Sequence, residues 1–285
     1  MNLEKIGIEI NSLLNKKREE LKLSFEEDTH TYTMLDKKGN LRSDWISVSG
    51  VVDNFYENFD AEAKSLSMCD GNLTEQRILV DKWAESGRVA ADMGSRTHYE
   101  LEIYINELYK RDKTVRKPLF ECATNELRRS DIMIGSGKKF IDTMHERGAY
   151  LLDTELVLGS NTLNYTGQPD KVWLLNNKGK LNVIVTDWKT NKPENFIPKV
   201  YTKKMYKPFD YLDSTALGKY NIQLPLYGRL IKDMLKDTKY AKILFSGYII
   251  VLLLDNGNFE EYRVHKKTYD RLATMDLSDY VIKKN

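Results

Sequence analysis

The sequence predicts an α/β protein in which a mixed central sheet, flanked by helices, follows a helical N-terminal half. Helical patterns fill most of the first 148 residues, whereas residues 150–187 read as strands joined by turns. A helical pattern over 219–237 then precedes two further strand patterns. This order of helices, three strands, a helix and more strands is typical of an α/β core.

The N-terminal half begins with a predicted helix over 2–22, whose apolar residues recur on one stripe. A β-hairpin is predicted over 25–48, with strands at 30–34 and 45–48, and we interpret it as a structural flap or sheet edge. Further helices are predicted at 49–58, 60–68, 73–92, 94–110 and 121–147. The last of them ends at Gly148.

The C-terminal half alternates between strands and helices. A strand over 150–158 precedes a hairpin of 163–175 and 180–187, which turns through Asn176-Asn177-Lys178-Gly179. Residues 190–218 show little periodicity, because prolines interrupt them. After the helix over 219–237, a closing hairpin and a last helix are predicted at 243–254, 259–264 and 266–275.

Composition bounds the function. The 285 residues are 41% hydrophobic and 30% charged, as in a soluble globular protein, and the net charge of +2 requires local basic patches to meet any anionic partner. Two cysteines exclude a disulfide framework and a four-cysteine iron–sulfur or zinc site. With no leader and no apolar run near 18 residues, we expect no membrane contact and a cytoplasmic location.

We expect one domain over 1–285. Residues 1–70 form an N-terminal extension of a helix and a β-hairpin, 71–265 form the core, and 266–285 form a C-terminal helix. Residues 135–139, Gly-Ser-Gly-Lys-Lys, are not a phosphate loop, because position 132 is Ile and Lys139 stands where Ser or Thr binds Mg²⁺. No nucleotide cofactor is expected.

The charged residues of the central hairpin carry the chemistry. Asp187 and Lys189 end the second strand at i and i+2, so both lie on one face, beside Asp170 of the first strand. Two carboxylates that face one point would leave uncompensated negative charge in a hydrophobic core. They suit a divalent cation, which prefers oxygen ligands. Taken alone, Asp187 and Lys189 are better interpreted as a surface ion pair that adds little stability, but together with Asp170, His98 and Gln223 they favour a catalytic interpretation.

Three further pieces converge on this hairpin. His98 and Glu102 share a helix face at i and i+4, in a helix that opens at Gly94. Glu155 lies in the preceding strand, and Gln223 and Tyr227 are one helical turn apart. Alternatives stay open: His98 as a core histidine, Glu102 and Glu155 as salt-bridge partners, and Tyr227 as core packing.

In this order, the segments GSRTHYELE, GQPD, DWK and QLPLY resemble the motifs of RecB-like nucleases of the PD-(D/E)XK superfamily. The resemblance covers about residues 80–255, and the N-terminal hairpin resembles that of phage and mitochondrial single-strand exonucleases. It implies a restriction-endonuclease-like core and makes His98 a metal ligand. It also implies that Gln223 and Tyr227 hold the nucleic acid strand and that Gln223 has a catalytic role.

Phosphodiester hydrolysis needs an activated water and compensation for charge on the phosphate, which one or two Mg²⁺ or Mn²⁺ ions supply. Asp170 and Asp187 would share the metal, and the Trp188 carbonyl would add an oxygen ligand. Lys189 would orient the water or stabilise the developing charge. Glu102 and Glu155 would orient ligands or water. As a metal ligand, the imidazole of His98 favours Mn²⁺ or a softer ion over Mg²⁺.

A basic segment follows the Asp-x-Lys strand, and single-strand binding uses lysines on phosphates and aromatic rings under unstacked bases. We expect it to be a flap over the strand that is mobile without DNA. Tyr201, Phe209 and Tyr211 lie among its lysines. Its predicted nucleic-acid-binding residues, with Arg96 in the His98 helix, are Lys192, Lys199, Lys203, Lys204, Tyr206 and Lys207.

The expected function is a metal-dependent DNA exonuclease that acts on single strands or strand ends. It would serve phage or bacterial recombination, repair or DNA degradation in the host cytoplasm, with a recombination or replication protein as a partner. The alternatives are a structure-specific endonuclease and a non-catalytic DNA-binding module on the same fold.

Overall fold

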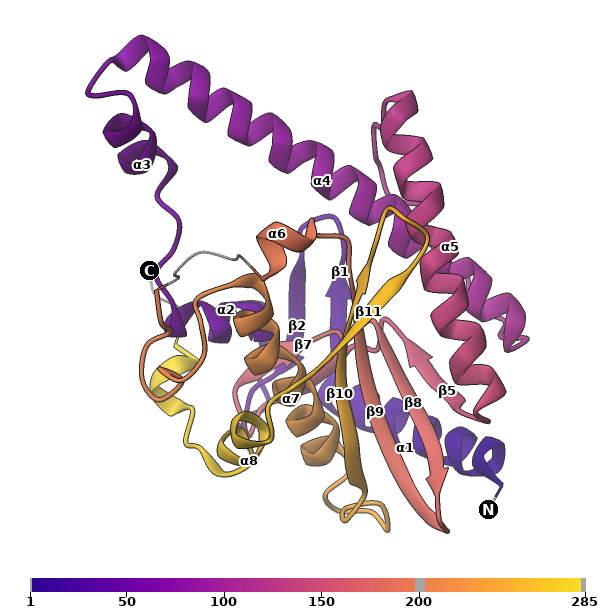
Figure 1. The fold of residues 1–285 in the computed structure, drawn as a ribbon. Helices are drawn as coiled ribbons and strands as arrows, with labels where there is room; N and C mark the ends of the chain where they lie inside the picture. Colours follow the sequence, from indigo (N-terminus) through magenta and orange to yellow (C-terminus); the bar gives the residue numbers. More distant parts are fainter. Residues whose placement is uncertain (1, 198–202, 283–285) are drawn as a thin grey trace.

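The computed structural model describes residues 2–197 and 203–282, and a five-stranded mixed sheet forms its centre (Figure 1). The strand order is β11-β10-β9-β8-β5, with β9 and β10 parallel and the other neighbours antiparallel. This arrangement confirms the α/β class. The strands are β5 (Tyr150–Thr154), β8 (Lys171–Asn177), β9 (Lys180–Lys189), β10 (Leu244–Leu253) and β11 (Phe259–Arg263).

Helices cover both faces of this sheet. α1 (Leu3–Leu21) and α7 (Ala216–Met234) pack on one face, where Val172 and Val185 enter the larger hydrophobic core. α4 (Leu73–Leu108) and α5 (Thr124–Glu146) pack on the other face, where Trp173 enters a second core. Because strand residues alternate between faces, neighbouring positions of β8 and β9 serve opposite sides of the sheet.

α4 is one continuous helix, so the predicted boundary before Gly94 is wrong. Met93, Thr97, Leu101 and Ile105 are its buried residues at i, i+4 spacing, and they face α5. That packing outweighs the modest helix penalty of glycine. Residues before Met93 extend away from the sheet and carry α3 (Ala61–Met68) at their far end (Figure 1).

The N-terminal strands form a separate small sheet. β1 (Ser24–Glu26), β2 (Thr31–Leu35) and β3 (Leu41–Arg42) pair in that order, so β3 takes the place predicted for a strand at 45–48. β4 (Ile46–Ser47) pairs in parallel with β7 (Tyr165–Gly167). Both predicted strands therefore form, but the second pairs with β7 and not with β2, so the predicted hairpin pairing is wrong.

Two predicted strands are interrupted where the site forms. The strand predicted over 150–158 ends at Thr154, and β6 (Leu158–Ser160) joins the sheet of β4 and β7. Glu155, between them, has a positive φ of 44°, and its N–H donates to the Asp170 carbonyl. Likewise, the strand predicted over 163–175 divides into β7 and β8, leaving Asp170 in the intervening loop.

The remaining helices are α8, near the C-terminal end, and several short helices in connecting segments. α8 (Lys266–Thr274) and α7 confirm the helices predicted near 266–275 and 219–237. Connecting segments contain α2 (Val48–Val52), η1 (Asp53–Phe55), α6 (Pro193–Phe196) and η2 (Ser278–Tyr280). No helix among the described residues is both long and apolar enough to cross a membrane.

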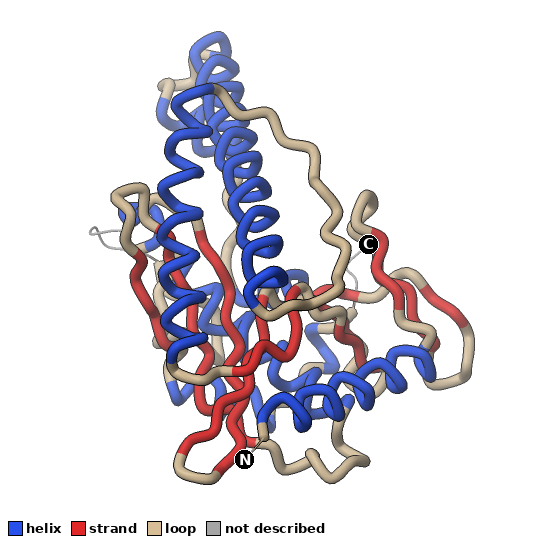
Figure 2. Tube along the Cα trace, turned by 90° about the vertical axis from the view of Figure 1, so that its right-hand side faces the viewer, coloured by secondary structure: helices blue, strands red, loops and turns tan. Residues whose placement is uncertain are grey.

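A long connection returns from the C-terminal end of α4 to the start of α5. It spans 109–123, and Figure 2 shows it as an extended loop beside the two long helices. Because α4 and α5 run in the same direction, this loop must travel back along their length, and it passes the edge strand β5. Structureless loops of this length are commonly functional.

Candidate functional site

The Asp170 carboxylate is the centre of the candidate site. Its Oδ2 accepts a hydrogen bond of 2.6 Å from the Trp188 N–H and lies 3.6 Å from His98 Nδ1. Asp170 directly precedes β8 and Trp188 lies near the end of β9, so the antiparallel pairing of these strands brings them together. His98 comes from α4, which packs on one face of the sheet.

Glu155 completes a group that can hold a cation. One ligand atom each from His98, Glu155 and Asp170 lie within 4.8 Å of one another. Gln168 Nε2 donates to the Glu155 carbonyl, which fixes the loop between β5 and β6. An imidazole nitrogen with carboxylate oxygens is a donor set suited to Mn²⁺ and acceptable to Mg²⁺. The sequence predicted only an orienting role for Glu155.

The electrostatics of this group favour a bound cation. Burial, with help from the Asp170 carboxylate, raises the pKa of Glu155 well above its usual range. Burial and Asp170 likewise raise the pKa of Asp187 to about 6, although Lys189 opposes this. For His98, burial and then Lys171 lower the pKa, so its imidazole is neutral and has a lone pair to offer. Carboxylates that repel one another at such close range are stabilised by a dication.

The backbone of Trp188 joins the site, whereas its side chain belongs to the core. A hydrogen bond from the His98 imidazole to the Trp188 backbone raises the pKa of His98, against the larger effects of burial and Lys171. The indole is fully buried and packs edge-on against Phe140. The Trp188 N–H thus lies at Asp170, and a metal-ligand role for the Trp188 carbonyl stays a prediction.

Asp187 and Lys189 face α7. Lys189 Nζ lies 2.5 Å from Asp187 Oδ2 and 4.2 Å from the centroid of the Tyr220 ring. Asp187 is only 2% exposed, so this is not the surface ion pair of the alternative interpretation.

Gln223 and Tyr227 share the α7 face, as their spacing predicted. Gln223 Nε2 donates to the Tyr227 hydroxyl at 2.8 Å. Tyr227 is buried, which raises the pKa of its phenol well above the usual value, and the nearby Asp187 carboxylate raises it further. A Cβ on Gly167 would lie 2.7 Å from the Tyr227 ring, which explains a glycine there. Tyr227 is therefore a packed wall of the site.

Lys171 is the residue that the sequence analysis missed. Its side chain is fully buried, and its Nζ has no hydrogen-bond partner among the described residues. The ammonium lies 5.0 Å from the centroid of the Trp188 ring and lowers the pKa values of His98 and Glu155. Strand alternation places it on the α4 side, opposite Lys189. The available signal was a lysine in the otherwise apolar run after Asp170.

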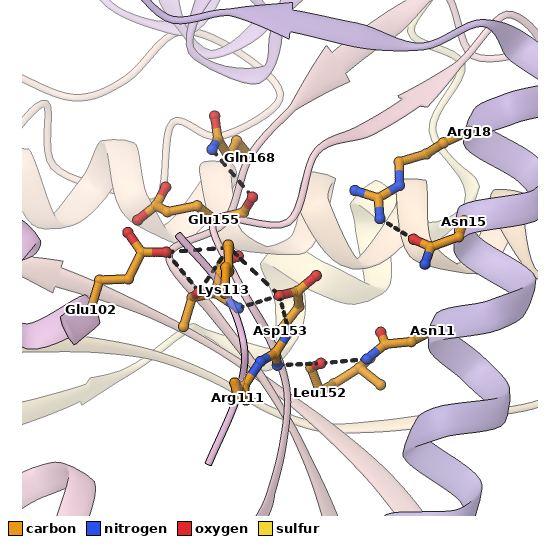
Figure 3. A network of polar contacts seen from close by, with 11 residues as sticks. Asn11, Asn15, Arg18, Glu102, Arg111, Lys113, Leu152, Asp153, Glu155 and Gln168 are labelled. Carbon is orange, nitrogen blue, oxygen red and sulfur yellow. Dashed lines mark hydrogen bonds and ion pairs between the residues drawn. The ribbon is translucent and has the colours of Figure 1, made fainter. Parts of the chain in front are cut away.

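Glu102 belongs to a neighbouring polar network (Figure 3). It accepts a hydrogen bond of 2.8 Å from Thr154 Oγ1 and lies 3.2 Å from Lys113 Nζ. Lys113 also donates to the Thr154 carbonyl at 2.5 Å, and Arg111 pairs with Asp153 at 2.6 Å. Glu102 shares a helix face with His98, as predicted, but these partners place it outside the three-residue cation group.

The basic segment is packed where the structure describes it. Phe209 is fully buried in the larger core with Met205 and Leu212, so its predicted role under bases is wrong. The Tyr206 N–H donates to the Phe55 carbonyl, which ties the segment to the body. Residues 203–214 are thus packed against the body, their mobility without DNA stays a prediction, and Lys199 and Tyr201 lie outside the described residues.

Several predicted nucleic-acid contacts have partners within the protein. Lys203 pairs with Glu57 and Lys204 with Asp213. Arg96 lies 2.5 Å from Asp131 and donates to the Leu127 carbonyl, so it joins α4 to α5. The exposed members of the set are Lys192, Lys203, Lys204, Tyr206 and Lys207, and Tyr211 is half-buried.

Comparison of the sequence with protein-family models and with curated proteins finds no match.

Proposed function

We propose that this chain is a metal-dependent DNA exonuclease with a RecB-like PD-(D/E)XK core. The observation that carries the proposal is the convergence on Asp170 of His98, Glu155 and the Trp188 backbone, with Asp187 and Lys189 beside them. A mixed sheet with helices on both faces also fits the resemblance. These groups come from four separate segments of the chain, so a structural ion pair does not account for them.

The metal would be held by His98, Glu155, Asp170 and Asp187. A divalent cation there would activate a water at neutral pH and would neutralise charge on the phosphate. Lys189 is partly exposed, with 17% of its side-chain surface accessible, and its ammonium can hydrogen-bond to the attacking water or a phosphate oxygen. The Tyr220 ring limits where that ammonium lies. Gln223 is half-buried and, oriented by Tyr227, offers its amide to the strand.

The charges around the site favour one ion over two. The carboxylates of Glu155, Asp170 and Asp187 face the ammonium groups of Lys171 and Lys189. One dication therefore more than offsets the remaining negative charge, and a second would leave a large positive excess in a poorly solvated place. Lys171 is the residue that decides this balance, because it adds a positive charge that has no hydrogen-bond partner in the part of the chain that the structure describes.

A nuclease assay tests the proposal. End-labelled single-stranded, duplex and circular DNA are incubated with Mg²⁺ or Mn²⁺, and the products are resolved by length. We expect mononucleotide release from linear single strands, no cleavage of circles, and loss of activity with EDTA and in Asp170→Asn. Asp81→Asn is the matched control, because Asp81 is exposed in the extended part of α4, away from the site. Absence of hydrolysis with either ion would refute the enzyme, and cleavage of circles would make it an endonuclease.

A further inference from the structure

A pocket of about 540 Å³ opens directly beside the cation group, and His98 and Glu155 are among its lining residues. Its other walls come from β1 and the following turn, from α4, and from residues 113–118 of the long connection. Its volume falls within the range of roughly 300 to 1,000 Å³ typical of ligand pockets. The N-terminal hairpin is thus part of a cavity wall rather than a remote sheet edge.

Aromatic rings form the hairpin side of this pocket. Phe25 is half-buried, with its ring 4.5 Å from the Tyr32 ring and 5.1 Å from the His30 ring. His30 is exposed, so the pair presents ring surface to the pocket. The buried Tyr32 supports Phe25 from behind, which holds that ring at low entropic cost.

The polar lining favours a neutral, hydrogen-bonding ligand over a phosphate. Its two long cationic side chains are already paired, Lys113 with Glu102 and Arg116 with Asp28. Gln168 and Thr114 add amide and hydroxyl groups of the kind that read the edge of a base. The anionic part of a nucleotide would instead lie at the adjoining cation group.

Resting on the proposed function, we propose that this pocket holds the nucleobase of the terminal nucleotide whose phosphate is cleaved. The base stacks on Phe25, as unstacked bases do on aromatic side chains in single-strand proteins. Arg116 lies 2.7 Å from Asp28 and 4.0 Å from Glu27, so it ties the 113–118 segment to the hairpin turn across the pocket. A pocket of this volume has room for a base, and its place beside the cation group sets that base next to the phosphate to be cleaved.

The proposal is tested with a fluorescent adenine analogue whose emission falls on stacking. Three single-stranded oligonucleotides of one sequence carry it at the 5′ end, at the 3′ end or in the middle. Binding is measured by anisotropy and by emission in Ca²⁺, a hard cation that carboxylates hold but that activates water poorly, so that the cation group is filled and cleavage is suppressed. We expect emission to fall for one terminal position only, which also identifies the end that is processed.

Variants connect that signal to the pocket. Phe25→Ala should abolish the emission change and weaken binding about fivefold or more, since base stacking on an aromatic ring is lost. His30→Asn should reduce it with the fold intact, because His30 is exposed and its φ of 50° is tolerated by asparagine. Leu41→Ala is the control, because Leu41 is 59% exposed on β3 and does not line the pocket.

The outcomes separate the two proposals. A response from the internal analogue alone, or an emission change in both Phe25→Ala and His30→Asn equal to that of the unmodified chain, overturns the terminal-base pocket and leaves the nuclease standing. If the unmodified chain binds none of the three oligonucleotides, the nucleic-acid function itself fails.

Discussion

Two lysines approach the candidate site from opposite faces of the sheet, and their surroundings differ. On the α7 side, Lys189 pairs with Asp187 and keeps part of its surface accessible. On the α4 side, Lys171 is fully buried above Trp188 without a hydrogen-bond partner among the described residues. An accessible ammonium can contact a substrate, whereas a buried one acts only through its charge. Lys189 is therefore the catalytic candidate, and Lys171 sets the electrostatic balance of the cation group.

The largest effect is expected at Lys189. Replacing it in Lys189→Met should lower kcat for single-strand hydrolysis by about 10²–10⁴-fold, because a positioned proton-transfer or charge-stabilising group is lost. Metal binding should be retained, which separates this lysine from the cation ligands. The rate is measured at saturating Mn²⁺ beside Lys180→Met, a control at the exposed, opposite end of β9. An equal rate in the two variants would remove Lys189 from the mechanism.

The partner of Lys189 gives a pH dependence. The pKa of Asp187 is raised to about 6 in the folded chain, so its contribution to stability is present at low pH and is lost as the pH rises through 6. Between pH 5 and 7.5, the free energy of unfolding of the metal-free chain should fall by about 1 kcal/mol more than that of Asp187→Asn. Urea denaturation at each pH measures the free energy of unfolding. The same pH dependence in the two proteins would argue against a raised pKa of Asp187.

Replacing the second lysine should change metal affinity instead of chemistry. Lys171→Met removes a positive charge beside the cation group, so Mn²⁺ should bind about tenfold more tightly, a change of about 1.4 kcal/mol. The site should also become able to bind a second ion, because less positive charge opposes it. Calorimetric titration gives affinity and stoichiometry together. Unchanged values for both would mean that the charge of Lys171 does not reach the site.

The smallest effect is expected at Arg96, which also lies on the α4 side. Because it pairs with a mostly exposed Asp131, Arg96→Ala should lower the free energy of unfolding by about 0.2–1 kcal/mol. Affinity for single-stranded DNA, measured by anisotropy, should stay the same. A fall in affinity at constant stability would instead restore the nucleic-acid role that the sequence suggested.

The parts of the site that the sequence predicted are those set by local spacing. Asp187 and Lys189 lie two residues apart on a strand, and Gln223 and Tyr227 lie one turn apart on a helix, so the period of each element fixes their shared face. The hairpin of β8 and β9 was predictable from its turn, and it brings Asp170 to the end of β9.

What the sequence did not predict depends on contacts between distant segments. Glu155 reaches the cation group because the chain breaks out of β5 at a positive φ, which an alternating strand pattern does not reveal. Lys171 is buried because α4 and Trp188 cover it. Gly94 continues a helix because α5 packs on the following residues, and Phe209 is in the core, although its neighbours are lysines.

The most direct test of the central claim is a calorimetric titration of Mn²⁺ into the unmodified chain, Asp170→Asn and Asp81→Asn. Asp81 is exposed in the extended part of α4, so its variant makes the same charge change away from the site. We predict one bound ion for the unmodified chain and for Asp81→Asn, and loss of binding in Asp170→Asn. Equal binding by all three proteins would contradict a cation held by Asp170 and its neighbours.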